Sequence, residues 1–174
     1  MSTLRFNTWQ NTGGTEVANS TLGTGKILQV VSTTLQTLFT TTVDADIPGL
    51  SVTITPTSAS NSILVFSNTS YASTGTTRGR LKMFRTIGGT STNLIGVNGS
   101  PGNGFAFAQG TAYNDLNWHQ YASVCHLDSP ATTSAVTYNI RADSEGTATV
   151  YINQSPGASS RGGVSTLTVM EVGS

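Results

Sequence analysis

Residues Gly163–Val172 alternate in side-chain type from end to end, the pattern of a β-strand. Apolar residues occur on both sides of this strand, which predicts a central strand between two packed sheets. Leu127–Tyr138 and Val150–Asn153 predict two more strands ahead of it, joined by short polar connections. The chain is therefore predicted to end inside its own β-sheet core.

Short strand patterns continue through the rest of the chain, and no helical period extends over three turns. The segment Asp44–Gly49 predicts a turn, because two acidic residues lead into Pro-Gly. About nine or ten strands at this spacing are typical of a β-sandwich, and we favour a jelly roll. The other predicted strands are Lys26–Ser32, Leu35–Val43, Leu50–Thr55, Ser62–Ser67, Arg80–Ile87, Asn93–Val97 and Trp118–Leu127.

The chain divides into a short arm and one domain. Residues 1–25 contain Leu4, Phe6 and Trp9 but show little periodicity, and they are too short to fold alone. We predict that these side chains dock the arm onto its own domain, a neighbouring protomer or a larger assembly. Residues 26–174 are predicted to form the sandwich.

The glycine-rich segment 98–115 is predicted to be the longest loop without regular structure. Long exposed loops often carry binding residues. Aromatic rings stack on sugars, so Phe105, Phe107, Tyr113 and Trp118 are candidate contacts for a receptor or glycan. The alternative is that these rings belong to the core.

Hydroxyl groups replace charges in this chain. Charged residues make up 9%, against roughly 25% in typical globular proteins, whereas 30 Thr and 21 Ser are present. The net charge is zero, which excludes the highly charged class of disordered chains and argues against nucleic acid as a partner. This composition fits an extracellular or virion surface.

One cluster of cations stands out. Arg78, Arg80 and Lys82 share one face of a predicted strand, and Arg85 follows them. The cluster is interpreted as a solvated face or a belt of ion pairs. The alternative is a patch that binds an anionic glycan or a partner subunit.

The sequence predicts neither membrane insertion nor an export signal. No apolar segment approaches the roughly 20 residues that span a bilayer, and Met1–Gln10 lacks an apolar core. The single cysteine, Cys125, allows no internal disulfide and is predicted to fill the core. We expect synthesis in a host cytoplasm and release on a particle.

The sequence gives only weak evidence for metal-binding or catalytic sites. His119 and Cys125 would lie about 20 Å apart along a strand, and His126 would face the other way, so a shared zinc ion is not expected. Asp44 and Asp46 could bind calcium, although turn formation is favoured. No nucleophile elbow is present, so we predict no enzyme, no catalytic residues and no cofactor.

The chain carries Leu4–Gly14, Gly25–Val31, Ser165–Val172 and four segments between them in one characteristic order. This order resembles a family of bacteriophage tail-fibre and appendage C-terminal domains, cyanophage-like in character. The resemblance implies a non-enzymatic, trimeric β-sandwich knob on the virion surface that takes part in host attachment. A tail tip, a head fibre or a capsid decoration (cement) protein held by its N-terminal arm remain alternatives, because no long shaft is present. The segments that carry the resemblance are Leu4–Gly14, Gly25–Val31, Gly49–Pro56, Asn61–Val65, Leu127–Pro130, Tyr151–Asn153 and Ser165–Val172.

The need to protect edge strands also favours self-association. A sandwich of this size must protect its edge strands, and this sequence offers few edge charges. Closed cyclic packing of three copies would cover weakly charged, Thr-rich faces. This packing argument and the resemblance together imply a homotrimer of the chain, and the resemblance implies two further partners, other virion proteins and a host cell-surface glycan or protein. The alternative is a hydrated monomer.

Overall fold

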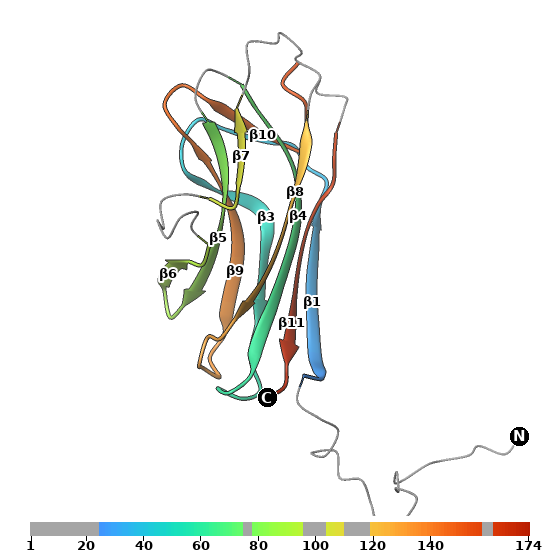
Figure 1. The fold of residues 1–174 in the computed structure, drawn as a ribbon, viewed down its shortest axis with the longest axis vertical. Coiled ribbons are helices and arrows are strands. Elements are labelled where there is room, and N and C mark those ends of the chain that lie inside the picture. The colour runs from blue at the N-terminus through green and yellow to red at the C-terminus, as the bar shows by residue number, and fades with distance from the viewer. Residues whose placement is uncertain (1–24, 75–77, 96–103, 110–118, 158–161) are drawn as a thin grey trace, which may run out of the picture.

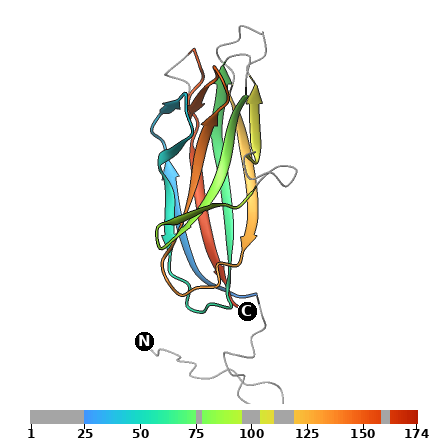
Figure 2. The ribbon, with the colours of Figure 1, turned by 90° about the vertical axis from the view of Figure 1, so that its left-hand side faces the viewer.

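The computed structural model describes residues 25–74, 78–95, 104–109, 119–157 and 162–174, which form an elongated sandwich (Figure 1). Seen at right angles to that view, most strands run close to the long axis (Figure 2). The described residues contain no helix. Their strands are β1 (Ile27–Leu35), β2 (Phe39–Thr41), β3 (Ala45–Ile54), β4 (Ser62–Thr74), β5 (Arg78–Ile87), β6 (Thr90–Asn93), β7 (Ala106–Gln109), β8 (Gln120–Asp128), β9 (Val136–Ser144), β10 (Thr149–Ile152) and β11 (Ser165–Val172).

Two antiparallel sheets make up the sandwich. The first has the order β1–β11–β4, with β8 on the other side of β4, and the second has β3–β9–β5, with β7 on the other side of β5. The chain crosses between the sheets from β3 to β4 to β5 and again from β8 to β9, as in a jelly roll. Short strands β10 and β2 extend the first sheet, and β6 pairs with β5. The predicted all-β, jelly-roll-like sandwich is confirmed.

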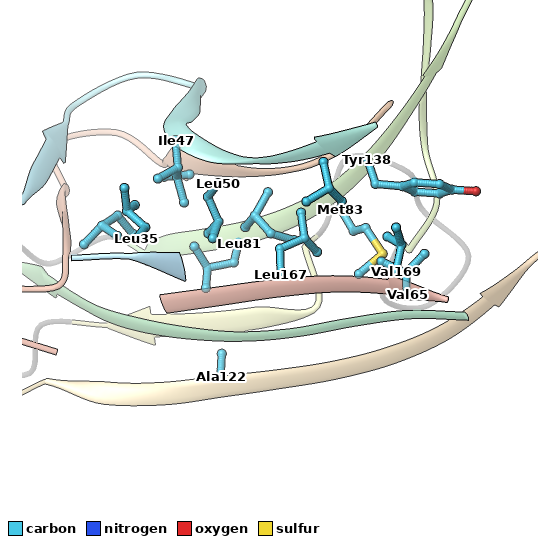
Figure 3. Packing of buried hydrophobic residues seen from close by; sticks show 14 of the residues in the cluster. Leu35, Ile47, Leu50, Val65, Leu81, Met83, Ala122, Tyr138, Leu167 and Val169 are labelled. Atoms are coloured by element: carbon cyan, nitrogen blue, oxygen red, sulfur yellow. The ribbon is translucent and has the colours of Figure 1, made fainter. Parts of the chain in front are cut away.

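Alternating side chains fill the space between the sheets. Figure 3 shows Val65 and Leu167 on one side of this space, with Leu81, Met83 and Tyr138 from the other sheet opposite them, and all five are fully buried. Burying one large apolar side chain contributes roughly 1.5–3 kcal/mol. Apolar packing therefore holds the two sheets together along most of their length.

The last strand, β11, lies between β1 and β4, so its predicted central place in a sheet is confirmed. Its inward side chains, such as Leu167 and Val169, are fully buried against the second sheet. Its outward side chains, including Met170 and Val172, are only half-buried. The prediction that packed sheets cover both sides of this strand is therefore correct for one side only.

The predicted turn at Asp44–Gly49 is wrong, because most of this segment belongs to β3. The register against β9 shifts between Asp46 and Ser51, which marks a bulge. The bulge lets both Ile47 and Leu50 point into the core, although two residues separate them. Pro48 is tolerated because β3 is an edge strand.

The predicted loop at 98–115 contains a strand, so the expectation of a structureless stretch is wrong. Ala106–Gln109 forms β7 and pairs with the first half of β5. Gly104 makes this approach possible, because a Cβ there would lie 1.9 Å from the Leu81 carbonyl oxygen. The Phe105 amide donates to that same oxygen at 2.8 Å.

Further strand boundaries differ from the prediction. β1 extends to Leu35, and only Phe39–Thr41 of the predicted strand Leu35–Val43 forms β2. Leu127–Tyr138 is not one strand, since β8 ends at Asp128 and β9 begins at Val136. Pairing with β5 starts at Thr90, so β6 precedes the predicted strand Asn93–Val97. The Gly88-Gly89 hairpin joins β5 and β6, and both glycines have positive φ.

A buried carboxylate stabilises one end of the first sheet. Glu171 Oε1 accepts hydrogen bonds from the Thr57 amide at 2.6 Å, the Thr57 hydroxyl at 2.8 Å and Asn61 Nδ2 at 2.6 Å. Glu171 Oε2 accepts from Gln29 Nε2 at 2.6 Å. Burial alone would raise the pKa of Glu171, but these four hydrogen bonds outweigh burial and lower the pKa to about 2.

A second buried polar cluster surrounds Asn153, which has a φ of 58°. Its side-chain amide donates to the carbonyl oxygens of Leu35 at 2.9 Å and Thr37 at 3.1 Å. Ser165 Oγ donates to Asn153 Oδ1 at 2.7 Å and accepts from the Ser70 amide at 3.0 Å. This cluster joins β4 and β11 to the segment that follows β10.

The sandwich has two distinct ends, which we call the base and the tip. The chain enters and leaves at the base, where the Gly25 amide donates to the Gly173 carbonyl at 2.7 Å. Strand β4 begins at the base, because Ser62 pairs with Val172, and its 13 residues extend about 40 Å to the tip. The tip therefore lies a full strand length away from the point of entry.

Candidate interaction surface

The two outer faces of the sandwich differ in charge. The outer face of the β3–β9–β5 sheet carries a belt of ion pairs. Lys82 Nζ lies 2.9 Å from Asp143 Oδ2 and 3.0 Å from Asp44 Oδ2. Arg80 Nε lies 3.0 Å from Asp143 Oδ2. Cationic and acidic side chains thus balance one another across neighbouring strands.

The belt continues toward β3. Asp46 Oδ1 accepts from Arg141 Nε at 2.8 Å and from Asn139 Nδ2 at 2.6 Å. The Arg141 guanidinium carbon also lies 4.3 Å from the centre of the Phe84 ring, a cation–π contact. Asp46, considered above as a calcium ligand together with Asp44, therefore contacts a cationic side chain of this face instead.

The candidate patch of Arg78, Arg80 and Lys82 lies on β5 at period-two spacing. Arg80 and Lys82 take part in the belt, and Arg78 is exposed where β5 begins. This arrangement corresponds to the ion-pair alternative drawn from the sequence. Binding of an anion or partner at this patch stays a prediction.

Arg85 faces the interior instead. Its Nη1 lies 2.8 Å and 3.1 Å from the two carboxylate oxygens of Asp128, which is buried. The Tyr138 hydroxyl donates to the same carboxylate at 2.7 Å. Burial and the Asp128 carboxylate raise the pKa of Tyr138, so its hydroxyl stays a donor. This cluster links β5, β8 and β9 across the sandwich.

The outer face of the first sheet is uncharged. We call it the outer apolar face, and it consists of the outward side chains of β8, β4, β11 and β1. None of these side chains, over the strand residues that the structure describes, is acidic or basic. The pairing register places residues in rows directly across the four strands, as antiparallel pairing requires. One row is Leu127, Leu64, Met170 and Val30, and the next is Cys125, Phe66, Thr168 and Ser32.

Large apolar side chains on this face are exposed. The exposed fraction is 57% for Leu127, 56% for Val30 and 44% for Phe66. Tyr121 on β8, 53% exposed, extends the face toward the tip, and Ile27 lies at its base. An exposed apolar side chain is ordinary when single, whereas a group of them at registered positions marks an interaction site.

Two pairs of polar side chains on this face bond to each other. Ser32 Oγ lies 2.8 Å from Thr168 Oγ1, one strand away. Ser123 Oγ donates to Asn68 Oδ1 at 3.0 Å. These groups already have partners within the face, so covering them would leave few polar atoms without a hydrogen bond.

Cys125 lies on the outer apolar face and is exposed, so its predicted role as a core filler is wrong. The odd-numbered residues of β8 point outward, and Cys125 pairs with the outward Phe66. His126 points the opposite way, as predicted, and His119 Nδ1 lies 3.1 Å from Ser155 Oγ. No group of three His, Cys, Asp or Glu side chains in the described ranges could hold a metal ion.

The structure places one of the candidate receptor side chains. Phe105 is half-buried and packs against the core, which matches the core alternative considered for it. Phe107 lies in β7, where its backbone pairs with that of Arg80 in β5. Tyr113 and Trp118 lie outside the described residues, as do the arm residues Leu4, Phe6 and Trp9.

Sequence reasoning did not identify the outer apolar face. Its signal was present, because Gly163–Val172 carries apolar residues on both sides and Ser62–Ser67 is an apolar run. The first pattern predicts burial between two sheets, and the second is typical of a buried strand. The structure shows that the second side of each strand faces outward.

No protein-family model matches the chain, and no curated protein sequence matches it significantly. The described part of the chain also has no helix long and apolar enough to cross a membrane.

Proposed function

We propose that this protein is a non-enzymatic structural protein of a bacteriophage virion. It forms a homotrimeric knob on the surface of the tail fibre or tail tip and contributes to host attachment. The observation that carries the proposal is the polarity of the fold. The chain enters at the base, and the ends of β7 and β10 that lead into the long connections to β8 and β11 lie in the tip half of the sandwich.

The polarity suits a protein that is attached at one end and makes contact at the other. The arm joins the sandwich at Gly25, beside Gly173 at the base. Segment 110–118 follows Gln109, which pairs with the first residue of β5, and precedes Gln120, which pairs with Tyr71. Both flanking residues lie in the tip half of the sandwich, so the segment that carries Tyr113 and Trp118 leaves and rejoins the sheets far from the base.

The surface chemistry supports a role for this protein outside a cell. Few charges and many hydroxyls give a surface that is hydrated without strong fields, which favours neutral ligands such as glycans over nucleic acid. Other virion proteins are the expected partners at the base. A host cell-surface glycan or protein is the expected partner at the tip. The resemblance to phage appendage domains adds the virion context.

Gold-labelled antibody against the protein, viewed by electron microscopy on intact virions of the phage that encodes it, tests the proposal. Label at the tail is the expected result. Label over the head would favour a capsid decoration protein or head fibre that stabilises the capsid through Leu4, Phe6 and Trp9. Absence of label, with an antibody shown to bind the native protein, would overturn the virion proposal.

Host attachment has a separate test. Phage carrying Tyr113→Ala and Trp118→Ala should adsorb to host cells more slowly than wild type. Val43→Ala is the matched control, because Val43 is exposed in the turn between β2 and β3. Equal adsorption of the double variant and the control, with normal incorporation of both proteins, would contradict a receptor role for these two residues.

A further inference from the structure

We propose that the outer apolar face is the surface through which copies of this chain associate. In the proposed homotrimer, three such faces meet around the threefold axis, so the outer apolar face of one copy is covered by the same faces of the other copies. The inference rests on the self-association in the proposed function and names the strands that carry it. It does not depend on where in a virion the protein lies.

The composition of the face is that of an interface core. Interface cores are depleted of charged residues and enriched in aromatic residues and Met. The described outward positions of β8, β4, β11 and β1 are uncharged and include Phe66, Tyr121 and Met170. The outer face of the other sheet carries the ion-pair belt instead, so one outer face of the sandwich is charged and the other is uncharged.

The face is large enough for a stable contact. Four strands about 4.8 Å apart, with four rows about 7 Å apart along them, cover roughly 500 Å² in projection. Projecting side chains expose more accessible area than this, which brings the face near the roughly 800 Å² that each partner buries in a standard interface. A segment or small ligand would cover only part of it.

The absence of charge on the described face favours a copy of itself as the partner. Two identical charged faces would repel each other, whereas two uncharged faces meet without that cost. The Ser32–Thr168 and Ser123–Asn68 contacts satisfy polar groups within each face. Burial against a second copy therefore removes water from Leu127, Phe66 and Val30 at little polar cost.

The sequence pattern of β11 points the same way. A strand with apolar residues on both sides is typical of burial on both sides. One copy buries Leu167 and Val169, but leaves Met170 and Val172 half-buried. A second copy on the outer apolar face would complete the burial that the pattern predicts.

Lysine substitutions on the full-length chain test the proposal. Val30→Lys and Leu127→Lys each place a charge in the row that also contains Leu64 and Met170. Both side chains are more than half exposed and thus not needed for the core. Val43→Lys is the matched control, since Val43 is 62% exposed but lies outside the four strands. Mass by light scattering and fold by circular dichroism are measured for each variant.

The expected result is a wild-type mass about three times that of the 18.1 kDa chain, as in the proposed homotrimer. Val30→Lys and Leu127→Lys should weaken association about 30-fold or more, because each would place an unpaired charge between two uncharged faces. Val43→Lys should match the wild type. Association that persists unchanged in both face variants would overturn the proposal, as would a wild-type protein that stays monomeric at about 100 µM, where interfaces of this size are saturated.

Cys125 provides a second readout, because it lies on the face and is the one cysteine in the chain. Its thiol should react with a disulfide reagent slowly in the wild type and rapidly in Val30→Lys. A monomeric wild type whose Cys125 becomes reactive only in a Phe6→Ser, Trp9→Ser variant would assign the face to the N-terminal arm and overturn the proposal. Antibody labelling of virions is independent of these results, so failure of this inference and failure of the virion proposal are distinguishable.

Discussion

The buried carboxylate of Glu171 should make part of the stability depend on pH. Its folded pKa is about 2, against 4.5 for an unperturbed glutamate. A group with a lowered folded pKa stabilises the fold above its unfolded pKa and loses that contribution as pH falls through the folded value. At about 1.4 kcal/mol per pKa unit, the contribution is about 3 kcal/mol at pH 7 and is lost between about pH 5 and pH 2.

Glu171→Gln isolates this contribution. All four groups that contact the carboxylate are donors, so a glutamine amide would turn its own donor toward one of them. We expect the free energy of unfolding to fall by about 3 kcal/mol at pH 7, and by much less at pH 2.5. Urea unfolding followed by circular dichroism at both pH values measures the difference.

Glu145→Gln serves as the control, because the Glu145 side chain is 47% exposed and lies 4.0 Å from Arg80. An exposed pair of this kind contributes at most about 1 kcal/mol. A destabilisation of Glu171→Gln that is equally large at pH 7 and pH 2.5 would refute the reasoning. Such a result would mean that shape, and not charge, determines the role of this side chain.

Three further substitutions have defined outcomes. Asp128→Asn should destabilise the protein by about 3 kcal/mol in urea unfolding, because it leaves the partly buried Arg85 guanidinium without its countercharge; a change below about 1 kcal/mol would contradict this. Gly104→Ala should weaken β7 pairing, since the new Cβ would meet the Leu81 carbonyl oxygen, and amide hydrogen exchange in β7 should accelerate. Ser165→Ala should cost about 2–3 kcal/mol by calorimetry, because it removes a hydroxyl that satisfies two buried polar groups; an unchanged melting temperature would contradict this.

The all-β jelly-roll-like architecture could be predicted because strand periodicity is local. Segments such as Leu50–Thr55 and Gly163–Val172 alternate strongly enough to identify strands without any neighbour. The errors occurred where a strand departs from simple alternation. The bulge at Pro48 resembles a turn in sequence, because Pro and Gly serve both structures.

Pairing partners could not be predicted from local pattern. β7 is four residues long, and only its contact with β5, made possible at Gly104, identifies it as a strand. The burial of Glu171 could likewise not be predicted, since its four hydrogen-bond donors come from residues up to 142 positions away. Long-range register decides both features.

The candidate surface was missed for a related reason. Periodicity predicts which residues of β11 point each way, but it does not say what covers them. The pattern alone therefore predicts that Met170 is buried, whereas the sheet order places it beside Leu64 and Val30 on the outer face. The ion-pair belt was among the alternatives, but its acidic partners required the β5–β9 register.

The position of Gly25 beside Gly173 has a mechanical consequence. Strand β1 starts at the base and pairs with β11 from Ile27–Val172 to Leu35–Ser165. A pull between an arm held at the base and a target held at the tip would act along these strands, so the hydrogen bonds of this pair would share the load in shear. The bonds would have to break together and not one after another, as they would if the strand were peeled sideways. The sandwich would therefore resist tension best along its long axis, which under the proposed function is the direction in which an attached virion would pull.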